Sequence, residues 1–178
     1  MAAFLVEDGT GLAAATSYAS VAELDAWMLE VGLTFTGSPT STQKEQWLVT
    51  ATRYIELLFG ALFKGNIEFP TTPQRLSFPR INLLDRNGLA VEGVPENLKS
   101  YTSGLAYRAA TVSLAPDPAQ TSSGAIKRQQ LGPMSVEYQS GDGGQTPADL
   151  YPDFPSIDGL LDEYVSGGGV HGSRVVQR

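Results

Sequence analysis

The 178-residue chain contains no cysteine, and this absence excludes several kinds of chemistry. Without a thiol there can be no disulfide, no thiolate metal site and no cysteine nucleophile, which suits a reducing cytoplasm. The sequence also lacks any run of about 18 apolar residues, so neither a transmembrane helix nor a membrane partner is expected. The first eight residues include two acids and no basic stretch, and no signal peptide is predicted.

Histidine is nearly absent as well. The single histidine, His171, lies beside a glycine run and lacks the nearby ligands or orienting carboxylate of a catalytic or metal site. The glycine-rich segments lack the lysine and the spacing of phosphate-binding loops. The acids Asp158, Asp162 and Glu163 are interpreted as a solvated helix surface. We therefore expect no enzymatic activity, no cofactor and no bound metal.

Basic residues are outnumbered by acidic ones, 12 against 19, for a net charge of −7. Tight nucleic-acid binding draws much of its free energy from Lys and Arg side chains that release phosphate counterions. The composition therefore argues against a dedicated DNA-binding protein. It suits solubility, or a surface past which DNA slides without adhering.

Three helices are predicted from caps and apolar periodicity. Ser20 with Glu23, and Thr40 with Gln43, have the spacing of capping boxes. Pro95 suits the first position of a third helix. The helices should end at Gly32, between 60 and 65, and near 114. Their apolar faces comprise Val21, Leu24, Met28 and Val31; Trp47, Leu48, Ala51, Tyr54, Ile55, Leu58 and Leu62; and Leu98, Tyr101, Leu105, Ala109 and Val112.

The patterns that predict strands are shorter than those that predict the three helices. Residues 4–6 suit a short strand, and Asp85–Gly88 suits the turn of a small hairpin in a proline-rich connection packed by Phe69, Leu76 and Phe78. Residues 125–138 alternate around Gly132-Pro133 as a β-hairpin would, and 156–165 suit a short helix. The predicted fold is mainly α: a small bundle of three to four helices with a β-hairpin and an extended C-terminal arm. We expect a helical domain that includes the β-hairpin at 1–138 and the arm, with its flexible tail, at 139–178.

Two groups of basic residues are candidates for contacts. Arg75, Arg80 and Arg86, with Phe78 between them, could form a nucleic-acid patch or could pair with Asp85, Glu92 or backbone carbonyls in this or a neighbouring chain. Arginine is enriched at protein interfaces. The second interpretation is favoured, and it predicts a subunit interface of Arg75, Phe78, Arg80, Asp85 and Arg86. Lys127 and Arg128 on the predicted hairpin are the candidates for facing DNA.

Several segments together resemble a known family. From residue 6 to about 162, they follow the order found in a family of small phage morphogenesis proteins. The matching segments are 6–11, 17–27, Lys44-Glu45, 51–55, 63–65, 74–80, 85–88, 94–96, 131–133 and 151–161. Members are often labelled DnaT-like single-stranded-DNA-binding proteins. They are also similar to head-to-tail connector, or adaptor, proteins of long-tailed phages.

The acidic charge and the scarcity of aromatic residues next to Lys or Arg favour the connector. The resemblance then implies a structural virion protein of the neck, assembled in the host cytoplasm as a dodecameric ring that extends the DNA channel. Its partners would be further copies of itself, the portal protein, a tail-side neck or tail terminator protein, and genomic double-stranded DNA passing without sequence-specific contacts. The portal-docking residues would be Val170, His171, Arg174, Val175, Val176 and Arg178. The alternative is a single-stranded-DNA-binding replication accessory protein.

Overall fold

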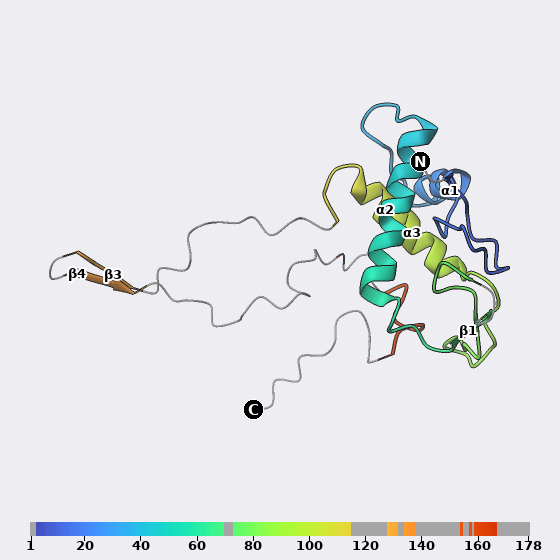
Figure 1. The fold of residues 1–178 in the computed structure, drawn as a ribbon. Helices are drawn as coiled ribbons and strands as arrows, with labels where there is room; N and C mark the ends of the chain where they lie inside the picture. The colour runs from blue at the N-terminus through green and yellow to red at the C-terminus, as the bar shows by residue number, and fades with distance from the viewer. Residues whose placement is uncertain are drawn as a thin grey trace. The chain divides into compact units, whose positions relative to one another are not determined.

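The computed structural model describes residues 3–69, 73–114, 154, 157 and 159–166, together with the backbone of 128–131 and 134–137. Three helices form the body: α1 (Val21–Glu30), α2 (Ser41–Phe59) and α3 (Glu96–Ala109). Helix α3 packs most extensively against α2 and also against α1 (Figure 1). The mainly helical fold with a small antiparallel hairpin is confirmed.

Both predicted capping boxes are present. The Ser20 hydroxyl accepts the Glu23 N–H at 3.2 Å, and the Glu23 carboxylate accepts the Ser20 N–H at 2.6 Å. Thr40 and Gln43 make the equivalent pair of bonds at 3.3 and 2.9 Å. Each box satisfies helix N–H groups that have no partner within the first turn, and this defines where α1 and α2 begin.

The buried faces agree with the predicted periodicity except at the helix ends. Val31 is 46% exposed because α1 ends at Glu30, and Val112 is 53% exposed because α3 ends at Ala109. Pro95 is the N-cap of α3, with extended backbone, rather than its first helical residue. The predicted strand at 4–6 is reduced to a single parallel bridge between Val6 and Ser17.

The connection between α2 and α3 contains two very short strands, β1 (Asn66–Ile67) and β2 (Arg80–Ile81), paired antiparallel. The predicted turn at 85–88 also forms, closed by a bridge between Leu84 and Ala90. The Asp85 carboxylate accepts the N–H groups of Asn87 and Leu89, both at 2.8 Å. The bond from the Leu89 N–H contributes most to a lowering of the pKa of Asp85, and the bond from Asn87 adds to it.

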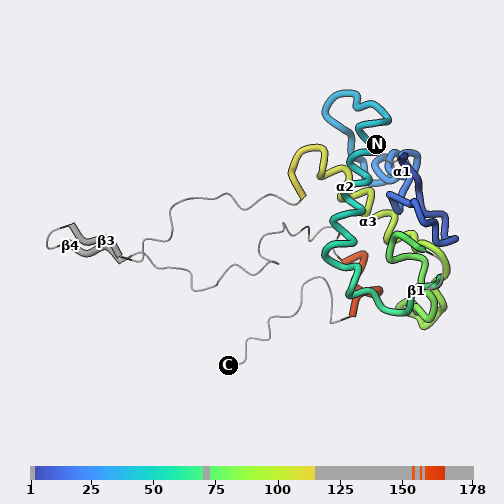
Figure 2. The backbone as a smooth tube through the Cα atoms, in the orientation of Figure 1, coloured from blue at the N-terminus to red at the C-terminus, as the bar shows by residue number. Residues whose placement is uncertain are grey.

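Of the helix expected at 156–165, Ile157 is helical and residues 156 and 158 lie outside the described part. Residues 159–166 form turns and pair with the chain that follows α2 (Figure 2). The Lys64 N–H donates to the Tyr164 carbonyl and the Ser166 N–H to the Leu62 carbonyl, both at 2.8 Å. Ile157 is buried against Gly104 of α3, where an added Cβ would lie 3.1 Å from its side chain. This segment is therefore part of the body.

The predicted hairpin at 125–138 forms as β3 (Arg128–Leu131) and β4 (Met134–Glu137), antiparallel, with Leu131 opposite Met134. It belongs to a separate unit of residues 115–152, whereas 1–114 and 153–178 form the other. The expected domain boundary between 138 and 139 stays a prediction. Within the described ranges, no helix has the length and apolar character to cross a membrane.

Candidate functional site

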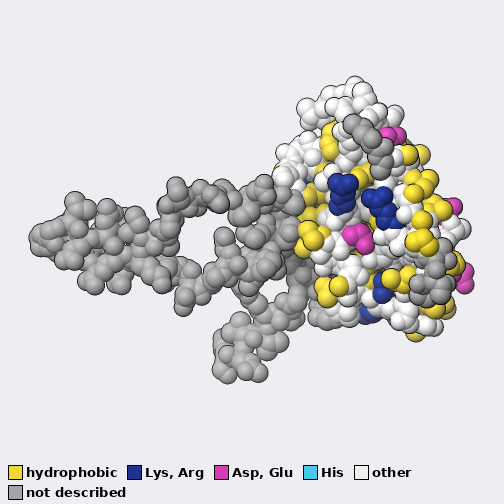
Figure 3. Space-filling model, viewed as in Figure 1, with side chains coloured by type: hydrophobic (Ala, Val, Ile, Leu, Met, Phe, Trp, Pro, Cys, Tyr) yellow, Lys and Arg dark blue, Asp and Glu magenta, His cyan; other side chains and the backbone are white. Residues whose placement is uncertain are grey.

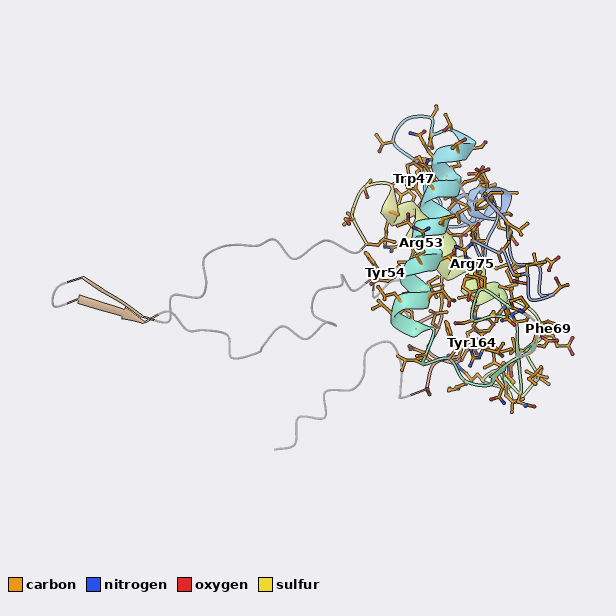
Figure 4. All side chains as sticks on the ribbon, viewed as in Figure 1. Trp47, Arg53, Tyr54, Phe69, Arg75 and Tyr164 are labelled. Atoms are coloured by element: carbon orange, nitrogen blue, oxygen red, sulfur yellow. The ribbon has the colours of Figure 1, made fainter. Side chains whose placement is uncertain are left out.

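A surface groove lies between α2, the N-terminal segment and the connection that follows α2. Two adjoining hollows of about 450 and 390 Å³ share Thr16, Val49, Arg53 and Arg75, and we call them together the α2 groove. Figure 3 shows Lys and Arg side chains side by side on this face, and Figure 4 labels Arg53 beside Arg75. The groove therefore brings together basic residues from two distant parts of the chain.

Within the part of the chain that the structure describes, the two arginines of the groove have no bound partner. Both side chains are exposed, and among the described residues neither guanidinium makes a hydrogen bond or an ion pair. The Arg86 guanidinium also has no partner among the described residues, but it lies outside the groove. The other described basic side chains are bound by carboxylates or backbone carbonyls: Lys44, Lys64, Arg80, Lys99 and Arg108. The groove thus contains two of the three unpaired cations of the described part.

A buried polar network fixes the residues that follow Arg75 to α2. The Tyr18 hydroxyl donates to Glu56 of α2 and accepts the Phe78 N–H at 3.3 Å. Glu56 also accepts the N–H and the hydroxyl of Ser77, at 3.1 and 2.8 Å. Burial, with the adjacent Glu56 carboxylate, raises the pKa of Tyr18 well above its ordinary value. The network ties residues 77–78 to α2, and with them the preceding arginine.

The opposite wall comes from the N-terminal segment. The Leu5 N–H donates a hydrogen bond to the Thr16 hydroxyl, and the Thr16 N–H donates to the Leu5 carbonyl. These bonds place the half-buried Phe4 at the edge of the groove. The loop between them is organised by the buried Glu7 carboxylate, which accepts the N–H groups of Gly9, Gly11 and Leu12 at 3.1, 2.9 and 2.9 Å. Charge-assisted bonds of this kind are stronger than neutral ones.

Apolar and acidic groups complete the groove. Val49 and Leu57 of α2 contribute its apolar surface, with Leu57 64% exposed. Glu45 and Glu56 also line it. Because Glu56 is engaged by Tyr18 and Ser77, its carboxylate is directed toward that network. The arrangement is suited to an extended ligand with both anionic and apolar parts, such as a single-stranded nucleic acid.

A second hollow of about 300 Å³ lies at the N-terminal end of α2, where Phe35, Trp47 and Tyr107 meet. The ring centroids of Phe35 lie 5.1 Å from Trp47 and 5.5 Å from Tyr107. All three side chains are half-buried, and the Lys44 ammonium lies 5.8 Å from the Phe35 centroid. These rings converge only in the folded chain, so the sequence did not indicate that Lys44 and Phe35 would be neighbours.

The predicted interface residues have dissimilar environments. Phe78 is fully buried between Tyr18 and Phe63. The Arg80 guanidinium donates to four backbone carbonyls, as expected for internal pairing: those of Phe63, Lys64, Gly65 and Ser77. Asp85 closes its own turn, and the Arg86 N–H donates to Glu163 at 3.3 Å. Of this set, only Arg75 lies in the groove.

Two groups of predicted site residues lie outside the described residues. They are the side chains of Lys127 and Arg128, and all of 167–178, which includes Val170, His171, Arg174, Val175, Val176 and Arg178.

Sequence reasoning missed Arg53 and Phe4. The signal for Arg53 was its place opposite the apolar stripe of the predicted second helix. Nothing in the sequence indicated that Phe4 and Arg75 would flank it. No group of metal-ligating residues occurs within the described ranges.

Comparison with known proteins identifies one family. The model of the family described as "Putative DnaT-like ssDNA binding protein" matches residues 2–178. No curated protein and no solved structure matches significantly. The match supports the family resemblance and contradicts the expected connector function, together with its ring, portal, tail and double-stranded-DNA partners. The error came from averaging charge over the whole chain, whereas the unpaired arginines are local. The chain belongs to the family of DnaT-like ssDNA binding proteins.

Proposed function

We propose that this protein binds single-stranded DNA along the α2 groove, and that it acts by binding rather than by catalysis. Family membership supports the ligand class. The single structural observation that supports the site is the pair of unpaired guanidinium groups, Arg53 and Arg75, lining one groove with exposed apolar surface beside them. Within the described ranges, these two groups have no partner to give up when a phosphate binds.

The groove can contact both chemical parts of a single strand. The guanidinium groups of Arg53 and Arg75 would donate to backbone phosphates, for which their planar fork is well shaped. Phe4, Val49 and Leu57 offer surface to unstacked bases. A duplex keeps its bases stacked and paired, so this apolar surface has no counterpart there. The geometry therefore favours single strands over duplexes.

The net charge of −7 is compatible with this function. Exposed charges act mainly within a Debye length, about 8 Å at physiological ionic strength. A phosphate in the groove would therefore respond chiefly to the adjacent arginines rather than to acids elsewhere on the molecule. Because Glu45 also lines the groove, we expect moderate rather than tight affinity.

The test is fluorescence anisotropy with a labelled single-stranded oligonucleotide and a duplex of the same length. The double variant Arg53→Gln/Arg75→Gln should weaken single-strand binding roughly tenfold or more, since about 1.4 kcal/mol corresponds to each tenfold change. Arg86→Gln is the matched control, because it removes an unpaired arginine outside the groove. Equal weakening in both variants, or equal wild-type affinity for duplex and single strand, would contradict the proposal.

A further inference from the structure

The hollow at the N-terminal end of α2 is half-open and has aromatic walls with polar groups beside them. Its aromatic walls come from the loop before α2 (Phe35), from α2 (Trp47) and from α3 (Tyr107). The Phe35 ring is inclined by 34° to Trp47 and by 40° to Tyr107, so the three rings form a tilted stack. A volume of about 300 Å³ is at the lower end of the range for small ligands.

Polar groups without partners lie beside these rings. The Gln43 side-chain oxygen accepts the Thr40 N–H, but no bond involves its amide nitrogen within the described part of the chain. The hydroxyls of Thr36 and Ser38 line the same hollow and are equally unpartnered there. Aromatic faces next to free donors and acceptors match a planar heterocycle with polar edges, which is the chemistry of a nucleobase.

This aromatic cluster is more than loop packing. Packing the loop on α2 would require contact between rings, but it would not require an open hollow or unpaired polar groups at its rim. Elsewhere in the body, aromatic residues such as Tyr18, Phe78 and Tyr101 are fully buried. The half-buried Phe35, Trp47 and Tyr107 instead retain surface on which a ligand can stack.

The aromatic hollow and the α2 groove are both lined by residues of α2, but they share no lining residue. Trp47, Thr50 and Arg53 follow at steps of three residues, and each step turns about 60° around a helix of 3.6 residues per turn. A strand that passes from Arg53 to Trp47 would therefore wind about 120° around α2. Thr50 itself lines the groove. From Trp47 to Arg53 the rise along α2 is about 9 Å at 1.5 Å per residue. Figure 4 shows both residues along α2.

We propose that the pocket formed by Phe35, Trp47 and Tyr107 takes one unstacked nucleobase from the strand held in the α2 groove. This inference rests on the proposed single-strand binding and adds a defined base site to it. The arginines would retain the phosphates, and the pocket would read the base through its stacking surface and the polar groups at its rim. The protein would then bind single strands through two chemically different parts.

The first test uses the pocket alone. The chain has two tryptophans, so its NMR spectrum contains two indole N–H signals, which Trp47→Phe and Trp27→Phe assign. Titration with each deoxynucleoside monophosphate should shift the Trp47 signal and leave Trp27 unmoved, because Trp27 lies on α1 at a different surface. Inorganic phosphate is the control and should shift neither. Absence of a Trp47 shift, or equal shifts of both indoles, would overturn the proposal.

The second test separates the pocket from the groove. For each variant, the affinity for an oligothymidylate is compared with that for an abasic oligonucleotide of equal charge. Trp47→Ala should lessen the preference for bases by roughly five- to 150-fold, the range measured for stacking on an aromatic residue. Trp27→Ala should leave it unchanged.

The outcomes of the two proposals can be distinguished. If Trp47→Ala keeps the wild-type preference while the arginine variant loses binding, the pocket proposal fails and the groove stands. If the wild-type protein binds no oligonucleotide but the mononucleotides shift Trp47, single-strand binding fails and the base site stands. The mononucleotide titration uses the wild-type protein, so a variant that does not fold cannot obscure this result.

Discussion

Tyr18→Phe is the change that most directly tests how the groove is held together. The tyrosine side chain is fully buried, and its hydroxyl both donates to the Glu56 carboxylate and accepts the Phe78 N–H. Phenylalanine retains the ring and its edge contact with Phe78, whose centroid is 6.0 Å away. The substitution therefore removes the hydroxyl and little else.

The expected loss of unfolding free energy follows from the two bonds. A hydrogen bond to a charged group contributes about 1.5–3 kcal/mol, and a buried N–H left without a partner costs about 1–3 kcal/mol. Because the groups share one network, the two values do not simply add. We expect a total of about 2–4 kcal/mol, which for a chain of this length corresponds to a fall in Tm of about 4–16 °C.

Urea denaturation followed by circular dichroism measures this loss. Tyr107→Phe is the matched control, because its hydroxyl makes one long bond, 3.4 Å, to the Thr34 carbonyl at the surface. That change should cost less than about 0.5 kcal/mol. If Tyr18→Phe proved as mild as the control, the network would not stabilise the fold and the account of how Arg75 is positioned would be wrong.

Three other predictions concern charge. Each phosphate contact to a single strand contributes about 0.7 to the slope of log affinity against log salt concentration, so two contacts contribute about 1.4. When salt rises from 50 to 200 mM, the affinity of Arg53→Gln/Arg75→Gln for a single strand should therefore fall by a factor about sevenfold smaller than that of wild type. An unchanged slope would exclude the two arginines as phosphate ligands. The free energy of unfolding should fall as the pH rises above about 10, because tyrosine in the unfolded chain ionises there while folded Tyr18, with its raised pKa, stays neutral. Denaturation of wild type and Tyr18→Phe at several pH values should show a shallower fall in the variant. Glu7→Gln should lower the free energy of unfolding by about 1–3 kcal/mol, because an amide cannot accept all three N–H bonds made to the carboxylate. Glu30 is exposed, so Glu30→Gln is the control and should leave the thermal melt nearly unchanged. Equal melting temperatures for the two variants would contradict the role of Glu7.

The local elements were readable from the sequence. A capping box lies within four consecutive residues, and apolar periodicity within a helix concerns near neighbours, so α1 and α2 could be placed closely. The turn closed by Asp85 and the hairpin around Gly132-Pro133 are local for the same reason. By contrast, β1 and β2 are two residues each and 12 residues apart, too short to leave a pattern.

The tertiary structure alone decided which residues share a surface. Phe4, Arg53 and Arg75 are far apart in the chain, and they meet because the Tyr18 network and the N-terminal bonds bring their segments onto α2. Phe35, Trp47 and Tyr107 likewise converge from a loop and two helices. Composition supplies the net charge, but burial and pairing determine which cations stay unpaired. That is why an acidic sequence led to the wrong functional expectation.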